Sequence, residues 1–361
     1  MKSRPTTSMA GHGVSRRSAL RSAVAMLVAG GADAAFPSVA QASRHNRGAA
    51  RPFLEYFPEP YDLLGARLAC TVINEGRRGA FQRLVDESLN AATRPGRFKL
   101  SPLFSGVGIM GIFHFDAVRS RQTGAWGVMR YYEASLSLLV MDTAAPSSLR
   151  GVPHIFNPVM LLNDPYALIA GREIYGFPKM LGQFQAKGFP EDGAAASHPL
   201  RRTEAEVSVH GFSTRSPDEV ADWHRLLDAT VRPWGEVFQN DQRHDGTLFL
   251  QGITPEMPAS TWNMIKALLS GNLQGIFLKR FPGCHAGAPA SYCSVVRAPY
   301  QMARLKQIRT GSGCVTLHNP ASFPLAEALG YTPDPSGRPV KVRGFGFLAD
   351  TDWVLGAGTE V

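Results

Sequence analysis

Short apolar runs separated by turn residues dominate the chain after residue 53, and this pattern predicts many β-strands. Predicted strands cover 67–73, 98–118, 128–141, 205–209, 275–278, 292–296, 314–317 and 340–347. Glycines at 106, 108 and 111 permit bulges or tight bends within the second of these runs. Many short strands with few helices indicate a barrel or packed antiparallel sheets.

Helical periodicity is confined to a few segments. Residues 78–89 place four apolar side chains on one helical face, and Asp164 followed by Pro165 is a capping pair that begins a short helix. Residues 216–219 (SPDE) form a capping box, which predicts an amphipathic helix through Val231, and 260–269 predicts another. We therefore expect a helical insertion at about 213–273 within one domain spanning 54–361.

The positive charge is concentrated at the beginning of the chain. The sequence has 361 residues and a formal net charge of +9, of which +7 falls within residues 1–51. The remainder is close to neutral, and its charge balance does not predict a surface that follows nucleic-acid phosphates. We therefore expect no nucleic-acid partner.

Residues 1–42 have the order of features found in an export signal. A basic region ending in Arg16 and Arg17 precedes a mildly apolar stretch at 22–36, and Ala40-Gln41-Ala42 supplies small residues for cleavage. The arginine pair resembles a twin-arginine signal; the alternative is a disordered basic tail. We predict a signal at 1–42, a linker at 43–53, and a periplasmic or secreted protein with no membrane span after signal removal.

The most distinctive segment is 163–182, NDPYALIAGREIYGFPKMLG. Its Lys179 lies among apolar residues, where a lysine either extends to water or is desolvated. Only roughly one lysine in a few thousand is neutral at pH 7, and burial lowers the pKa of the amine. A neutral amine attacks a ketone carbon to form a Schiff base.

Gly-Arg-Glu at 171–173, Phe-Pro-Lys at 177–179 and Leu-Gly at 181–182 together resemble the signature of the acetoacetate decarboxylase family. The resemblance covers roughly 55–361 apart from 213–273. It implies that Lys179 is the Schiff-base residue, that Glu133 moves or positions protons, and that Arg67 holds Glu133 or the substrate carboxylate. It also implies an α+β fold, mainly antiparallel β: a closed cone-like barrel or double-layered sheet with peripheral helices, in a homo-oligomer.

The sequence is compatible with more than one activity. Family decarboxylases often carry a second lysine where this chain has Met180. The expected activity is decarboxylation of a 3-oxo acid such as acetoacetate. The alternatives are an aldolase, dehydratase or cyclase that acts on a larger keto acid, or a non-catalytic binding protein. Taken alone, Glu133 is more typical of a solvated strand position and Arg67 of a surface residue.

The expected partner is a small-molecule keto acid, with no cofactor and no metal. The histidines and the four cysteines show no metal-ligand spacing. Whether Cys284 and Cys293 form a disulfide stays open. Arg172 and Glu173 are interpreted as structural residues that pair and close the turn presenting Lys179.

Overall fold

A computed structural model describes residues 59–92, 98–122, 127–144, 153–189, 204–214, 218–234, 238–239, 273–281 and 290–361. The predicted signal at 1–42, the predicted linker at 43–53, and the predicted helix at 260–269 lie outside these residues. None of the described helices is both long enough and apolar enough to cross a membrane.

The described residues are mostly strand. The strands are β1 (Tyr61–Asn74), β2 (Leu100–Pro102), β3 (Val107–Ser120), β4 (Met129–Asp142), β5 (His154–Leu162), β6 (Lys179–Lys187), β7 (Ala205–Ser213), β8 (Asp222–Pro233), β9 (Phe238–Gln239), β10 (Leu273–Phe281), β11 (Tyr292–Leu317), β12 (Val340–Leu355) and β13 (Thr359–Glu360). The α-helices are α2 (Ala80–Val85), α3 (Pro165–Ala170) and α6 (Leu325–Ala328). A short π-helix follows each of the first two: η3 (Asp86–Asn90) after α2 and η4 (Gly171–Tyr175) after α3. The predicted mainly antiparallel β fold with few helices is confirmed.

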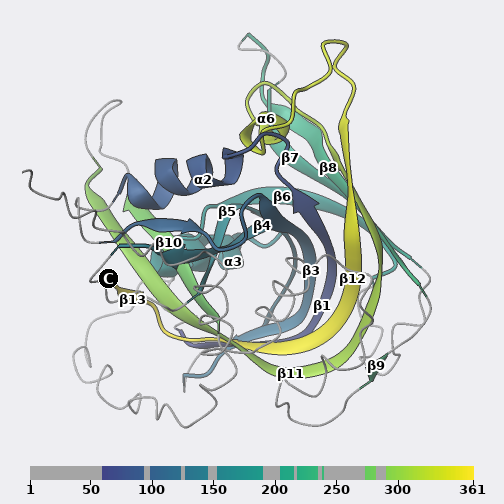
Figure 1. Cartoon of the computed structure of the whole chain (residues 1–361). Helices are drawn as coiled ribbons and strands as arrows, with labels where there is room; N and C mark the ends of the chain where they lie inside the picture. Colours follow the sequence, from purple (N-terminus) through teal and green to yellow (C-terminus); the bar gives the residue numbers. More distant parts are fainter. Residues whose placement is uncertain are drawn as a thin grey trace, which may run out of the picture. The chain divides into compact units, whose positions relative to one another are not determined.

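The strands form one sheet that closes on itself (Figure 1). Around the closure the order is β4, β5, β10, β11, β12, β1, β3 and again β4, and we call these strands the ring. Pairing within the ring is antiparallel except between β5 and β10. Because side chains alternate across a strand, every ring strand has one inner and one outer face.

Strands β6, β7 and β8 make a second connection between β5 and β11. The long strand β11 serves both parts: residues 292–300 pair with β10, whereas 311–317 pair with β8. Two apolar cores result. One lies inside the ring and includes Leu68 and Phe115, whereas the other joins the outer-face residues Ala69 and Ile73 to β7, β8, α2 and α6.

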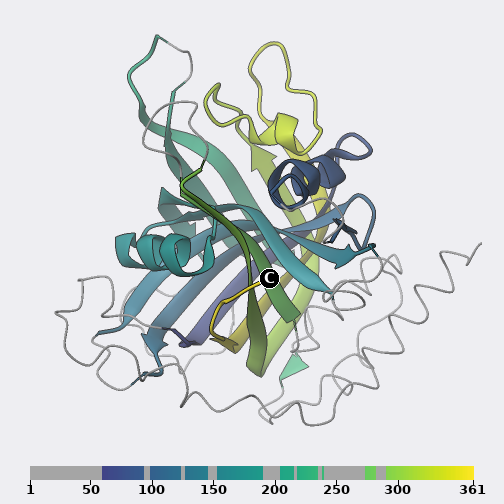
Figure 2. The same ribbon diagram turned by 90° about the vertical axis from the view of Figure 1, so that its left-hand side faces the viewer.

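Helices lie at the periphery of the strands (Figure 2). The predicted helix at 78–89 is confirmed as α2 and η3, and its residues Phe81, Val85 and Leu89 are fully buried. The predicted cap of α3 is also confirmed, since Asp164 Oδ1 accepts a hydrogen bond of 2.7 Å from the backbone N–H of Ala167. This cap fixes the start of the segment that leads to Lys179.

The predicted helix from 216 to Val231 is wrong, because residues 222–233 form strand β8. The strand pairs with β7 on one side and with β11 on the other. Its buried residues Leu227, Ala229 and Val231 recur every second position, which is the strand period. Val220, which the helix would have placed on its apolar face, is 88% exposed.

Candidate active site

Lys179 is the first residue of β6 and follows the turn that ends η4. Gly176 closes this turn at φ +81°, and a Cβ there would lie 2.4 Å from the Cα of Lys279. At the other end of η4, a Cβ on Gly171 would lie 2.6 Å from Cδ of Lys179. Glycine is therefore needed at 176 for the turn and for close approach of β10, and at 171 for the lysine side chain.

The structure brings Lys179 and Glu133 together. Lys179 Nζ lies 3.2 Å from Glu133 Oε2, and their side chains are only 5% and 8% exposed. The same Nζ donates to the backbone oxygen of Ala167 at 3.4 Å. It also lies 5.0 Å from the ring centre of Phe177 and 5.4 Å from that of Tyr131, within the range of a cation–π contact. The environment is thus apolar and aromatic, with one opposite charge.

The phenols near the pair stay neutral. Burial, with the charge of Glu133 adding to it, raises the pKa of Tyr131 well above its usual value. The same two causes raise the pKa of Tyr300. Both phenols therefore keep their protons throughout the physiological range.

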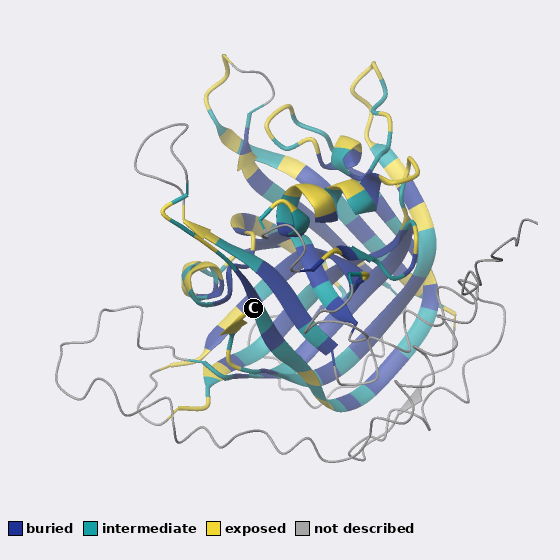
Figure 3. Cartoon of the chain, turned by 60° about the vertical axis from the view of Figure 1, so that its left-hand side comes forward, coloured by how far each residue is buried: buried dark blue, intermediate teal, exposed yellow. Residues whose placement is uncertain are grey.

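Glu133 lines a cavity inside the ring, and the strands around this cavity are buried along much of their length (Figure 3). The cavity has a volume of about 90 Å³. Its lining is mostly apolar and consists of Leu63, Leu68, Cys70, Ile109, Phe113, Phe115, Glu133, Ser135, Ser137, Ile155, Asn157, Met160, Leu273, Tyr300, Met302, Phe347, Ala349, Thr351 and Trp353. Lys179 is not among these residues. Its Nζ contacts Glu133, which does line the cavity.

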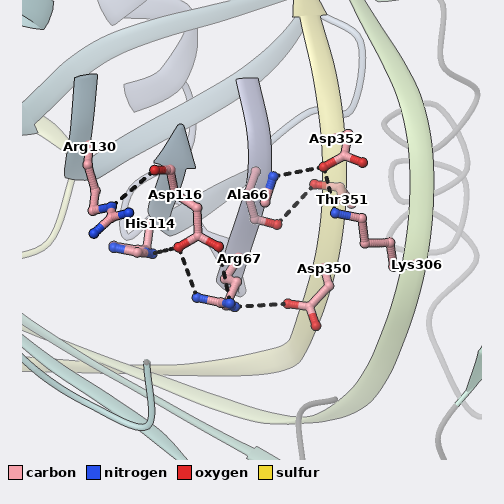
Figure 4. Close-up of polar contacts among 10 residues, drawn as sticks. Ala66, Arg67, His114, Asp116, Arg130, Lys306, Asp350, Thr351 and Asp352 are labelled. Carbon is pink, nitrogen blue, oxygen red and sulfur yellow. Dashed lines mark hydrogen bonds and ion pairs between the residues drawn. The ribbon is translucent and has the colours of Figure 1, made fainter. Parts of the chain in front are cut away.

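Arg67 lies in a different polar cluster on β1, β3 and β12 (Figure 4). Its guanidinium makes two contacts of 3.2 Å with Asp116, one to each carboxylate oxygen, and Nε lies 3.9 Å from Asp350. His114 Nδ1 lies 3.4 Å from the same Asp116. Arg67 is 8% exposed. It is thus a buried cation held by two carboxylates.

This cluster occupies the outer face of the ring. Leu68, the neighbour of Arg67 in β1, lines the cavity together with Phe113 and Glu133, its partners across β3 and β4. Arg67 points the opposite way, in the row of His114. The structure therefore does not bring Arg67 to Glu133, and this geometry does not support the role predicted for it.

The predicted pairing of Arg172 with Glu173 is not seen in the described structure. Both residues lie in η4 with exposed side chains. Within the described ranges, no group of three or more histidine, cysteine, aspartate or glutamate side chains is arranged to hold a metal ion.

The polar inner wall of the cavity was not predicted. Ser135 and Ser137 line it together with Asn157, whose Nδ2 donates to Ser137 Oγ at 2.7 Å. A sequence pattern marks part of this wall, because Glu133, Ser135 and Ser137 recur every second residue within an apolar strand. Such alternation places all three side chains on one face of β4.

Comparisons with known proteins agree with this fold. The model of the acetoacetate decarboxylase family matches residues 79–212, which include Glu133 and Lys179. A comparison with curated proteins finds no match. Among solved structures, acetoacetate decarboxylase from Legionella pneumophila superposes with a TM-score of 0.53 and 17% identity, covering 91% of this chain and 98% of that one.

Two further structures superpose with TM-scores of 0.50. The enduracididine biosynthesis enzyme MppR with bound HEPES buffer is 15% identical, with 84% of this chain and 88% of that one covered. A second structure of acetoacetate decarboxylase is 16% identical, with 85% and 91% covered. The chain therefore has the acetoacetate decarboxylase-like fold, and its segment 79–212 matches the model of that family.

Proposed function

We propose that this protein is an exported lyase that decarboxylates a 3-oxo acid, such as acetoacetate, through an imine on Lys179. One observation carries the proposal: Lys179 and Glu133 form a buried pair at 3.2 Å beside an apolar cavity. A buried amine next to a carboxylate has both groups that imine chemistry needs, a nucleophile and a proton carrier.

The proposed reaction begins with proton transfer from the Lys179 ammonium to Glu133. The neutral amine attacks the keto carbon of the substrate, and loss of water gives a protonated imine. The carbon–carbon bond to the carboxylate breaks, CO₂ leaves, and the electron pair moves into the imine to form an enamine. Glu133, which returned its proton in the loss of water, takes a new proton from solvent and passes it to the enamine carbon. Hydrolysis of the resulting imine by water then releases the ketone and regenerates the Lys179 ammonium. The apolar surroundings favour the step that removes the carboxylate charge.

A second candidate keeps the imine on Lys179 but uses it for an aldol condensation, a dehydration or a cyclisation of a larger keto acid. The apolar lining of the cavity beside Glu133 favours this alternative, because it offers contacts to a larger keto acid. A non-catalytic binding protein would be favoured by an exposed Lys179 or by a Glu133 that faced elsewhere. Lys179 is instead 5% exposed and in contact with Glu133.

Borohydride trapping tests the proposal. The protein is incubated with acetoacetate and borohydride, and the adduct is mapped by mass spectrometry while released CO₂ is measured. We expect an adduct on Lys179 that is absent in Lys179→Met and retained in Lys187→Met, since Lys187 is an exposed lysine of the same strand. Failure to label Lys179, under conditions that label a known Schiff-base enzyme, would exclude the imine with this substrate. An adduct without CO₂ release would favour the second candidate.

We also propose that residues 1–42 direct export to the periplasm or beyond through the twin-arginine pathway. Support comes from the order of the basic, apolar and small-residue regions. A cell fractionation of the full chain should find the protein outside the cytoplasm, and Arg16→Lys combined with Arg17→Lys should retain it inside. Equal distribution of both forms would contradict the proposal.

A further inference from the structure

We infer that the substrate is a keto acid with an extended apolar chain, which lies inside the ring and runs along β4 away from Glu133. This inference rests on the proposed function, because it assumes that the keto group reacts at Lys179. It adds the class of substrate that the cavity accepts, which acetoacetate alone does not explain.

The direction of the chain follows from the inner face of β4. Glu133, Ser135 and Ser137 line the cavity in that order along the strand. Ser137 is four residue steps along the strand from Glu133, which is a span of ~13 Å. Ile155 lines the far end, since it pairs with Leu139, two residues beyond Ser137. A span of this size matches an extended chain of about ten carbon–carbon bonds.

The chemistry of the wall selects an apolar chain. Glu133 is the one charged residue among those that line the cavity. Several polar groups of the wall bond to protein atoms: Asn157 donates to Ser137 Oγ and to the backbone oxygen of Leu136, and Trp353 Nε1 donates to Thr351 Oγ1 at 2.6 Å. These groups therefore do not need a polar ligand to satisfy the hydrogen bonds that they already make within the protein.

A small substrate would not reach the apolar residues that line the cavity beyond Ser135. A keto acid of four carbons occupies the region next to Glu133 and makes no contact with Ile155 or Asn157. Each further methylene buried against the apolar wall strengthens binding about three- to fourfold. The geometry thus predicts a rise in kcat/KM with chain length until the far end is reached.

The first experiment uses the unmodified protein and 3-oxo acids of four, seven, ten, thirteen and sixteen carbons, with CO₂ release as the readout. We expect kcat/KM to rise at least hundredfold from four to ten carbons and to level off or fall beyond about thirteen carbons. A profile that is flat, or that falls from four carbons onward, would overturn the inference.

A binding measurement separates this inference from the proposed function. Calorimetric titration of Lys179→Met with decan-2-one and with acetone measures binding without an imine. Tight binding of decan-2-one together with no adduct on Lys179 in the unmodified protein would retain the apolar site and reject the proposed function. Trapping of acetoacetate on Lys179 together with a flat chain-length profile would retain the function and reject the apolar substrate.

A substitution at the far end gives an independent test. Ile155→Trp fills the cavity beside Ser137, whereas Val220→Trp adds the same ring at a position that is 88% exposed. We expect Ile155→Trp to lower the ratio of kcat/KM for thirteen carbons to that for four carbons at least tenfold, and Val220→Trp to leave this ratio unchanged. Equal ratios in both variants would contradict the inference. If Ile155→Trp does not fold, the chain-length series on the unmodified protein decides.

Discussion

Glu133→Gln should destabilise the protein strongly, because it leaves the Lys179 ammonium buried without an opposite charge. The side chain of Lys179 is only 5% exposed, so water cannot replace the lost carboxylate. Lys179→Met should be costly for the reciprocal reason, since Glu133 is 8% exposed on its side chain. The double variant removes both charges and should recover most of the loss.

The size of the effect follows from the separation of the charges. Two unit charges 3.2 Å apart attract each other by about 5 kcal/mol at an effective dielectric constant of about 20. Removal of one partner of a buried pair costs about 3–5 kcal/mol, whereas replacement of the whole pair by groups of similar volume is often neutral. We therefore expect each single variant to lose about 3–5 kcal/mol of unfolding free energy, with a coupling energy of about 3 kcal/mol or more in the double-variant cycle.

Urea unfolding of the four proteins at pH 7 measures these free energies. Lys187→Met is the matched control, and as an exposed substitution on the same strand it should change stability by less than about 0.5 kcal/mol. A loss below about 1 kcal/mol in Glu133→Gln, with no coupling in the cycle, would refute a buried ion pair at this position. It would also remove the main support for proton transfer from Lys179 to Glu133 as the first step.

Three further predictions concern neighbouring features. Gly171→Ala adds a methyl group 2.6 Å from Cδ of Lys179, so borohydride trapping should slow at least tenfold while circular dichroism stays unchanged. Arg67→Met should cost about 3–5 kcal/mol in urea unfolding, because it leaves Asp116 and Asp350 without their cation, yet the folded fraction should still be trapped on Lys179. Burial raises the pKa of Asp228, but hydrogen bonds from neighbouring side chains outweigh it and hold the pKa below its usual value. The stabilisation from ionised Asp228 is therefore complete above about pH 4 and lost as the pH falls through the lower folded value, so Tm should drop more steeply in acid for the unmodified protein than for Asp228→Asn.

Much of the fold can be predicted from the sequence, because strand periodicity and capping are local properties. The capping box at 216–219 is also a local signal, and it led to the wrong prediction of a helix from 216 to Val231. Residues 222–233 contain apolar positions compatible with either period, and pairing with β7 and β11 makes them a strand. The contacts that decide this segment come from residues distant in sequence, so the local pattern does not contain them.

The role expected for Arg67 came from the family resemblance, and the backbone of β1 explains why the geometry does not support it. Leu63 and Leu68 both line the cavity, although they are five residue steps apart. Strict alternation would put residues at an odd number of steps on opposite faces of the strand. The register shifts between Leu63 and Ala66, where Gly65 adopts φ +61°. Such a bulge reverses which alternate residues face inward. Alternation counted from Leu63 across this bulge would put Arg67 on the inner face, whereas the observed register puts it on the outer face in the row of His114.

Met180 bears less on the chemistry than the sequence indicates. Lys179 and Met180 are adjacent in β6, so their side chains leave opposite faces of the strand, and they are 5% and 36% exposed. A charge at position 180 would lie on the solvent side, where water and salt screen its effect on Lys179. The surroundings of the amine are instead set by Phe177, Tyr131 and Glu133, which contact it directly. The absence of a second lysine therefore does not argue against imine chemistry, and the substrate range depends on the wall of the ring cavity.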